Sequence, residues 1–541
     1  MSTNNFKFRN LMFFTFFILF PLLSSAQLTQ QWVNRYGGTE YMNDHSSKMD
    51  GSGNLYVACS GYNSSTGYYI MVMKFTSGSS GSPVWTSTYT GISGESELAT
   101  AIALDNSGNV YVTGQILGAF PLIDAITLKY NNNGVLQWSQ RYNNALGGYD
   151  YGTCITVDAN GNVVVGGVTN NGAGQPYDYL TIKYNSSGVM QWVRTYDGPS
   201  GTDEDDIVNS IAADAFGNVI VTGRAGWTNT GYDIVNVKYS ASGVGGATRY
   251  DGGEHSDDMG YTVAFDQAGN FYVTGSTIEN GVNPEITTLK FSSTNVPVWT
   301  KHYDYAYDVP HDMKLDAAGN VYVTGYSKDG SNYNFITLKY NNNGTQLWAK
   351  RLTEGDVANS LALDGNGNVY VTGYAYNSNS DIATVKYNSN GVQIGNVLTY
   401  NASTAFERGT SIVSNTSGSV VYVTGLSPTT QSSDVVVIKY SQLVGISNIN
   451  SEIPENFSLE QNYPNPFNPS TTIKFAVPAE DNVSIKVYDM LGKEVAVLVN
   501  EIVKAGNYEV KFEASKLSSG TYFYRITTSS FNDVKKMMLV K

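Results

Sequence analysis

The sequence is poor in the residues on which most catalytic and metal sites depend. Among 541 residues there are two cysteines and four histidines, and charged residues make up only 14%. Two cysteines exclude a framework of several disulfides, and we expect Cys59 and Cys154 to be free thiols. The Gly-x-Ser-x-Gly, P-loop and His-Glu-x-x-His motifs are absent, so the sequence signals no nucleophile elbow, phosphate loop or zinc helix.

Basic residues are also scarce, and the formal net charge is −14. Nucleic-acid binding needs basic patches, so this charge balance argues against a nucleic-acid partner. The same excess of acidic residues favours solubility outside the cell.

A long apolar run occurs only at the start of the chain. Lys7 and Arg9 precede an apolar stretch from Leu11 to Leu23, and small residues up to Ala26 follow it. This order is typical of a secretory signal peptide over residues 1–26, cleaved between Ala26 and Gln27. The stretch of about 13 residues is too short to span a bilayer comfortably. Its removal would leave no transmembrane segment in the mature protein.

The dominant feature that is present is a repeat. The stretch from Asp364 to Gly373 occurs in eight variants, with equivalent glycines 48 to 56 residues apart: Gly53, Gly108, Gly161, Gly217, Gly269, Gly319, Gly367 and Gly418. A fixed period of that size indicates a repeat architecture. Each unit has four short apolar-alternating runs separated by turn residues, here named strands A to D, and no helical period appears between them. Such units predict an all-β protein made of β-propeller blades.

The phase of the repeat predicts how the ring closes. The repeats begin with a lone strand D at residues 31–36 and end with a strand C at residues 434–440. The first strand can therefore complete the last blade, which gives an eight-bladed propeller with four-stranded blades over residues 27–440. Closure also removes exposed sheet edges, which invite aggregation.

The C-terminal region, residues 454–541, has a different character. The Gly-Asn repeat stops, and strand-like runs follow a proline-rich opening at 454–469. Their lengths predict a small immunoglobulin-like antiparallel β-sandwich. The polar residues 441–453 are predicted to be a linker between the two domains.

Two resemblances follow from these motifs. Gly-Asn-Val-Tyr-Val-Thr-Gly and Thr-Leu-Lys-Tyr-Asn resemble the bacterial β-propeller repeat family often called SBBP repeats, a family that implies no single activity. The runs 463–469, 487–492, 517–522 and 535–541 resemble the C-terminal sorting domain of type IX secretion cargo, the Por-type tail. That resemblance implies that residues 454–541 engage the type IX secretion machinery, and that the protein is secreted or placed on the outer-membrane surface of a Gram-negative bacterium.

Two acidic registers point to one end of the propeller. Eleven residues before the repeat glycine, at the start of strand A, stand Glu97, Asp150, Asp206, Asp258, Asp308, Asp356 and Glu407. The start of strand C carries Asp124, Asp178, Asp233, Glu285, Asp381 and Asp434. These acids should share one face, where they could bind a cation or a polyol. Alternatively, each carboxylate accepts backbone N–H bonds in its own turn. At the opposite end we interpret the strand C lysines and the turn aspartates after strand A as ion pairs within blades.

Histidines supply the only asymmetry in this pattern. His255 and His311 fall in adjacent repeats at the acidic end, which raises the hypothesis of a ligand, metal or acid–base site there. No metal is specified by the sequence. No cofactor is implied either, although calcium is an ion that such an acidic face could hold.

The sequence thus favours a secreted or cell-surface propeller without enzymatic activity, with a ligand-binding, adhesive or structural role. Exposed aromatic loops such as residues 303–307 would suit a glycan or protein ligand. The alternative is an extracellular polysaccharide hydrolase or lyase with its site at the acidic channel mouth. A pocket in which His255, His311 and acids converge would favour the enzyme.

Overall fold

The structure is a computed structural model. It describes residues 27–541 apart from 38–40, 66, 92–94, 119–122, 145–146, 173–174, 199–203, 228–229, 254, 280, 377–379, 403–405, 429–432, 443–445, 451–452, 504 and 515–516. The predicted signal peptide lies outside the described residues. Within them all regular structure is β-strand, and no helix is long and apolar enough to cross a membrane.

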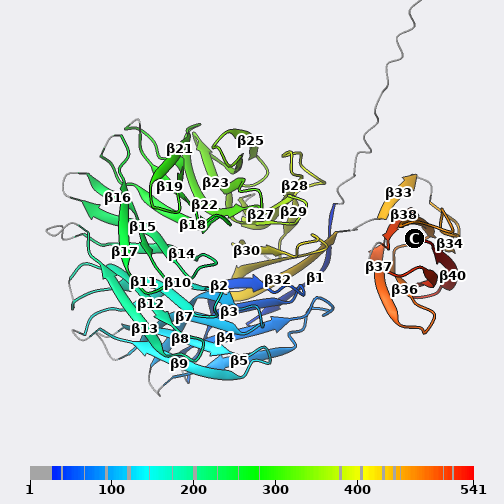
Figure 1. The fold of residues 1–541 in the computed structure, drawn as a ribbon, viewed down its shortest axis with the longest axis horizontal. Coiled ribbons are helices and arrows are strands. Elements are labelled where there is room, and N and C mark those ends of the chain that lie inside the picture. The colour runs from blue at the N-terminus through cyan, green and yellow to red at the C-terminus, as the bar shows by residue number, and fades with distance from the viewer. Residues whose placement is uncertain are drawn as a thin grey trace, which may run out of the picture.

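Eight four-stranded antiparallel sheets form the blades of the propeller, as the sequence predicted, and they lie around a common centre (Figure 1). Blade 1 comprises β2(Tyr41–Met49), β3(Leu55–Asn63), β4(Gly67–Phe75) and β5(Trp85–Tyr89), and blade 2 comprises β6(Ser96–Leu104), β7(Val110–Leu117), β8(Ile123–Tyr130) and β9(Leu136–Tyr142). Blade 3 comprises β10(Tyr151–Val157), β11(Val163–Thr169), β12(Asp178–Tyr184) and β13(Met190–Tyr196), and blade 4 comprises β14(Ile207–Ala213), β15(Val219–Trp227), β16(Gly231–Tyr239) and β17(Gly245–Tyr250). Blade 5 comprises β18(Met259–Phe265), β19(Phe271–Thr277), β20(Glu285–Phe291) and β21(Pro297–Tyr303). Blade 6 comprises β22(Tyr307–Leu315), β23(Val321–Asp329), β24(Asn332–Tyr340) and β25(Gln346–Leu352). Blade 7 comprises β26(Val357–Leu363), β27(Val369–Tyr376), β28(Ser380–Tyr387) and β29(Leu398–Tyr400). Blade 8 comprises β30(Arg408–Ser414), β31(Val420–Pro428), β32(Ser433–Gln442) and the N-terminal β1(Leu28–Tyr36).

Strand A is the innermost strand of every blade. Each strand A contacts the strand A of the next blade, in the circular order β2, β6, β10, β14, β18, β22, β26, β30 and back to β2. Because strands alternate in direction, the D–A and B–C loops share one end of the propeller, here called the loop end. The A–B and C–D turns share the other, the turn end.

The ring closes as the sequence predicted. β1 is antiparallel to β32, with Leu28 opposite Gln442 and Tyr36 opposite Val435. The Trp32 indole Nε1–H then donates to the Ser79 carbonyl of blade 1 at 2.9 Å. The seam between the first and last strands therefore uses the same contacts as the other blade boundaries.

Most strand C lysines do not form a close ion pair with the turn aspartate of their own blade, although its charge acts on them, as Asp50 does on Lys74 and Asp214 on Lys238. Their amines join blades instead. Lys129 Nζ donates to the Ser186 carbonyl of the next blade at 2.8 Å, and Lys238 Nζ donates to that of Ser293 at 2.6 Å. Only Lys183 also forms an ion pair with a turn aspartate, Asp158, at 2.9 Å among the described residues. The aspartates instead accept from the backbone and the asparagine of their own turn, as Asp105 does from Asn109. These lysine side chains point to a turn of the next blade rather than to the turn of their own blade. The sequence alone does not show this direction.

Blade 8 has no C–D turn, since its fourth strand comes from the N-terminus. Gln442, 7% exposed, takes the place of that turn. Its Oε1 accepts from Lys386 Nζ at 2.7 Å, and its Nε2 contacts the Tyr370 hydroxyl. Burial lowers the pKa of Lys386 to about 8, so the ammonium depends on such acceptors.

We expect Gln442→Ala to destabilise the propeller by about 1–3 kcal/mol, because a buried cation loses an acceptor. Thermal or urea unfolding of the mature chain measures this. Gln137→Ala is the control, since Gln137 is exposed and, among the residues that the structure describes, bonds only to the Val135 carbonyl. Equal stability of the two variants would contradict this role for Gln442.

The C-terminal domain is a sandwich of two four-stranded sheets, as the sequence predicted. One sheet has the order β33(Ile446–Asn450), β38(Gly506–Glu513), β35(Ser470–Val477), β34(Ser458–Leu459). The other has the order β37(Glu494–Val503), β36(Asp481–Tyr488), β39(Gly520–Thr527), β40(Asn532–Leu539). Ile473, Ile485, Tyr524 and Met537 are fully buried between them.

The domain boundary differs from the sequence prediction. Residues 441–453 were expected to be a linker, but β32 continues to Gln442 and Ile446–Asn450 forms β33. β33 pairs with β38, with Ile446 opposite Val510. The sandwich therefore begins before residue 454, at an edge strand whose polar residues gave no strand signal.

The cysteines are free thiols, as expected: Cys59 is buried and Cys154 is partly buried. Burial raises the pKa of each thiol to about 12, so both side chains are inert as nucleophiles.

Candidate ligand site at the loop end

The strand A acids lie at the loop end, each at or just before the start of its strand. All are almost fully buried except Asp356, which is partly exposed. Each accepts hydrogen bonds from nearby backbone N–H groups. Asp206 accepts from Gly198 at 2.7 Å and Gly226 at 2.9 Å, and Asp308 accepts from Tyr305 at 2.7 Å and Ala306 at 3.0 Å. The corresponding donors to Glu97, Asp150, Asp258, Asp356 and Glu407 are Gly91, Asn144, Gly252, Tyr376 and Ala402. This geometry favours the turn interpretation for the register as a whole.

The strand C acid of one blade lies beside the strand A acid of the next. Charge from one therefore acts on the other across the blade boundary, as it does for Asp178 and Asp206. Such like-charged pairs disfavour ionisation, and a strand D arginine relieves two of them among the described residues. Arg249 Nε donates to Asp233 at 2.7 Å, and Arg141 contacts Asp124. At the closing boundary, where the strand A register has Met42 in place of an acid, Arg35 Nη2 lies 3.0 Å from Asp434.

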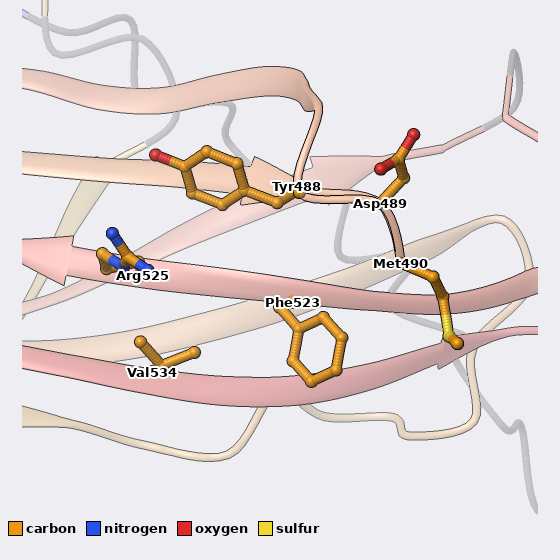
Figure 2. A pocket seen from close by; sticks show the side chains of 7 residues that line it. Tyr488, Asp489, Met490, Phe523, Arg525 and Val534 are labelled. Carbon is orange, nitrogen blue, oxygen red and sulfur yellow. The ribbon is translucent and has the colours of Figure 1, made fainter.

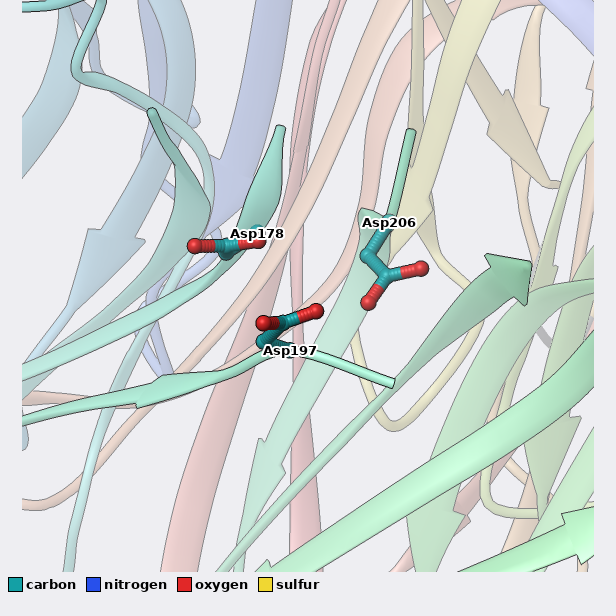
Figure 3. A group of neighbouring side chains, drawn as sticks. All are labelled: Asp178, Asp197 and Asp206. Carbon is teal, nitrogen blue, oxygen red and sulfur yellow. The ribbon is translucent and has the colours of Figure 1, made fainter. Parts of the chain in front are cut away.

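Among the described residues, two boundaries bring three carboxylates close together. At the boundary of blades 3 and 4, oxygens of Asp178, Asp197 and Asp206 lie within 4.8 Å of one another (Figure 3). The strand D residue here is Thr195 rather than arginine. Burial, together with Asp197 and Asp206, raises the pKa of Asp178 to about 6. Burial also raises the pKa of Asp206 to about 6, against the two backbone donors that lower it. The second group, Asp233, Asp251 and Asp258, lies at the boundary of blades 4 and 5.

A carboxyl whose pKa is raised by folding stabilises the protein below its unfolded pKa, and this stability is lost as pH rises through the folded pKa. For Asp178 and Asp206 that window runs from the ordinary aspartate pKa of 3.8 to the folded pKa of about 6. We therefore expect a higher Tm at pH 5 than at pH 8. Asp178→Asn should reduce the difference in unfolding free energy between pH 5 and pH 8 by about 1–2 kcal/mol, allowing for the partial exposure of Asp178. Differential scanning calorimetry in metal-free buffer at both pH values measures this. An unchanged difference in the variant would rule out repulsion at this boundary.

His311 belongs to a register that sequence reasoning missed. In every strand A one residue forms a β-bulge: Asp44, Thr100, Thr153, Asn209, Tyr261, His311, Asn359 and Thr410. Most of these side chains donate to a carbonyl of the next blade, as Thr153 does to Val208 at 2.8 Å and Asn359 does to Gly409 at 2.7 Å. His311 Nδ1 lies 2.9 Å from the Ala358 carbonyl in the equivalent place. A bulge register shifts by one residue within the strand, and the alternating apolar pattern does not reveal it.

The two candidate histidines have different surroundings and do not form a joint site. His255 is exposed and contacts only Asp251 among the described residues, with Nδ1 3.1 Å from Oδ2. His311 packs against Tyr326 and Tyr261, at ring-centroid distances of 5.6 and 6.4 Å. Burial lowers the pKa of His311, so its imidazole is neutral at neutral pH. With Nδ1–H donated to Ala358, this side chain is oriented by the fold.

A pocket of about 340 Å³ opens beside His311, on strands A and B of blades 6 to 8. Its lining consists of His311, Val357, Asn359, Tyr374, Arg408 and Thr410. A volume of this size accommodates a small polar ring. The lining offers an aromatic ring, a guanidinium, an amide and a hydroxyl, a combination that binds hydroxyl-rich anions.

Exposed aromatic side chains gather at the loop end of the same blades. This aromatic set consists of Tyr305, Tyr307, Tyr333, Tyr376 and Phe406, which are 55%, 41%, 37%, 57% and 59% exposed. Tyr376 and Phe406 stack at 6.1 Å across the boundary of blades 7 and 8. The exposure of residues 305 and 307 agrees with the sequence expectation for that loop.

The sandwich carries its own pocket, of about 300 Å³, on the sheet that contains β36, β39 and β40. Phe523, Arg525 and Val534 project from adjacent strands there, next to the turn that bears Asp489 and Met490 (Figure 2). Met490 and Leu491 in this turn are 70% and 94% exposed.

Comparison with protein families confirms both resemblances. Residues 461–541 match the model of the secretion system C-terminal sorting domain, and residues 347–379 match that of the β-propeller repeat. No curated protein matches the chain. Solved structures with a similar architecture share little sequence. PorZ, a surface component of the type IX secretion system of Porphyromonas gingivalis, is 13% identical with a TM-score of 0.37, over 92% of this chain and 74% of that one.

Two further solved structures have similarly low sequence identity to this chain. Sqt1 of Chaetomium thermophilum is 8% identical with a TM-score of 0.48, over 77% of this chain and all of that one. A polysaccharide lyase of family PL25, an ulvan lyase, is 10% identical with a TM-score of 0.36, over 70% and 97%.

The fold and the family matches together define an exported eight-bladed β-propeller. Its C-terminal sorting domain directs the chain through the type IX secretion system to the bacterial cell surface or beyond it.

Proposed function

We propose that this exported propeller is a non-enzymatic binding protein for saccharides that carry an acidic group. The observation that carries the proposal is the aromatic set beside the Arg408 pocket, which breaks the eightfold pattern of the loop end. Aromatic faces stack on sugar rings, and a guanidinium pairs with a carboxylate or sulfate.

A polysaccharide hydrolase or lyase is supported less well. The strand A carboxylates accept local backbone bonds, and His311 Nδ1 faces the Ala358 carbonyl. General acid–base catalysis needs groups free to exchange protons with a substrate. The geometry of these side chains favours binding over catalysis.

A glycan array that contains neutral, carboxylated and sulfated polysaccharides tests the proposal on the mature chain. We expect acidic glycans to be retained, and Arg408→Gln and Tyr376→Ala each to weaken binding at least about tenfold. Tyr62→Ala is the matched control, because Tyr62 is a 41% exposed tyrosine at the loop end of blade 1, outside the aromatic set.

An array without binding would overturn the proposal, as would equal loss in Tyr62→Ala. Release of shortened oligosaccharides on prolonged incubation would replace it with the hydrolase or lyase alternative. A protein ligand captured in place of glycans, with the same dependence on Tyr376, would keep the surface but contradict the saccharide.

A further inference from the structure

We propose that the boundary between blades 4 and 5 is a binding site for one calcium ion, held by Asp233, Asp251 and Asp258. Carboxylate oxygens of these residues lie within 4.8 Å of one another. Asp233 is the third residue of strand C of blade 4, Asp251 follows strand D of that blade, and Asp258 precedes strand A of blade 5. The site would therefore join two blades.

A buried, unsatisfied oxygen distinguishes this group of three carboxylates from the group between blades 3 and 4. Asp233 and Asp258 are fully buried, and Oδ1 of Asp233 has no hydrogen-bond donor within the part of the chain that the structure describes. Asp258 accepts from the backbone N–H groups of Gly252 and Ile278. A buried carboxylate oxygen without a donor is costly, and a bound cation would remove that cost.

The remaining oxygens are already fixed, which would pre-organise the site. Asp233 Oδ2 accepts from Arg249 Nε at 2.7 Å and from Thr230 Oγ1 at 3.0 Å. Asp258 Oδ2 accepts from the Gly252 N–H at 2.5 Å. Arg249 Nη2 also lies 2.9 Å from Asp251 Oδ2, and the guanidinium stacks on Trp227 at 4.4 Å. The carboxylates are thus held in place before any ion arrives.

Charge balance indicates a divalent ion. Three carboxylates and one guanidinium leave a formal charge of −2 in this group. An all-oxygen, carboxylate-rich ligand set suits calcium, which accepts irregular coordination completed by water, better than zinc or copper.

The neighbouring group at blades 3 and 4 serves as an internal control. Asp178, Asp197 and Asp206 are equally close together, but Asp197 is exposed and both oxygens of Asp206 have backbone donors. The two groups differ in the buried Asp233 oxygen that is left without a donor, and the experiment tests this difference.

Terbium luminescence on the metal-free mature chain tests the site, because Trp227 and Tyr250 lie close enough to sensitise a bound lanthanide. We expect one equivalent of terbium to give sensitised emission that calcium displaces, and calcium to raise the Tm by about 2 °C or more. Asp251→Asn, at a partly exposed position that folding tolerates, should weaken terbium and calcium binding at least tenfold. Asp258→Asn should do the same, and Asp178→Asn should leave the affinity unchanged.

Two results would overturn the proposal. One is a wild-type chain with neither calcium-displaceable emission nor a calcium-dependent Tm at millimolar calcium; Asp233 and Asp258 would then share a proton or a water. The other is loss of binding in Asp178→Asn with binding retained in Asp251→Asn, which would place the ion at the neighbouring boundary.

Discussion

A chain that ends at Gln442 should fold into the complete propeller and remain in the periplasm. The propeller has all its strands by that residue, because β32 ends there and β1 supplies the fourth strand of blade 8. The described core residues of the sandwich form a cluster separate from those of the blades, so its loss leaves the described blade cores intact. What is lost is the sorting domain, which the secretion system handles. We expect surface exposure to fall to background, an effect far larger than that of any single substitution.

The truncation must remove residues 443–541, because a cut at residue 454 leaves β33 behind without its partner β38. Fractionation with antibody labelling of intact cells measures export, and protease resistance of the periplasmic fraction measures folding. A matched control keeps the sorting domain and deletes nothing, but carries Ser530→Ala at an exposed position between β39 and β40, outside the runs that resemble sorting domains. Surface display of the truncated chain would refute the role of the domain. Rapid degradation of a truncated chain purified from the cytoplasm would refute independent folding.

Deleting residues 27–36 should prevent the ring from closing. β1 pairs with β32 over most of its length, and Trp32 lies in the cluster with Phe75 and Tyr422 that joins blades 8 and 1. The loss of a whole strand and its apolar contacts exceeds the ~5–15 kcal/mol of net stability typical of a folded domain. The deletion also exposes the edge of β32, which invites pairing with other chains.

Size-exclusion chromatography and circular dichroism of the deletion variant should therefore show aggregates or a partly unfolded chain. A second variant tests whether the defect comes from the open ring: residues 28–36 are placed after residue 442, behind a turn copied from residues 131–134, so that the same strand can again pair with β32. Blades 2 to 6 join strands C and D through such turns, so the rearranged chain should recover a folded monomer. A folded monomer from the simple deletion would contradict closure by β1.

The sequence predicted the architecture because the repeat carries it. The Gly-Asn turns, the alternating strands and the phase of the first and last strands were sufficient for the number of blades and for the strand that closes the ring. β33 was not predictable, because the segment Ile446–Asn450 is short and mostly polar, and it gains its strand conformation from pairing with β38. Such edge strands depend on tertiary context more than on propensity.

The candidate site was predictable only in part. Alignment of the repeats placed the acidic registers at one end, since residues at the same register share a face. It could not reveal which oxygens lack donors, because Gly252 and Arg249 reach Asp258 and Asp233 through the fold. Nor could it reveal the bulge register. His311 therefore drew attention as a rare residue type, whereas the structure shows that it occupies the same bulge position as Thr153 and Asn209.

The position of β32 has a mechanical consequence. It is hydrogen-bonded to β31 on one side and to β1 on the other, and its last residue, Gln442, is where the propeller ends. A pull on the chain beyond Gln442 acts along the strand, across hydrogen bonds that lie perpendicular to it. Both ladders would have to shear together before β32 could slip. A pull on the chain before Leu28 would instead strain only the single ladder between β1 and β32, so the propeller should withstand tension better through its C-terminal end than through its N-terminus.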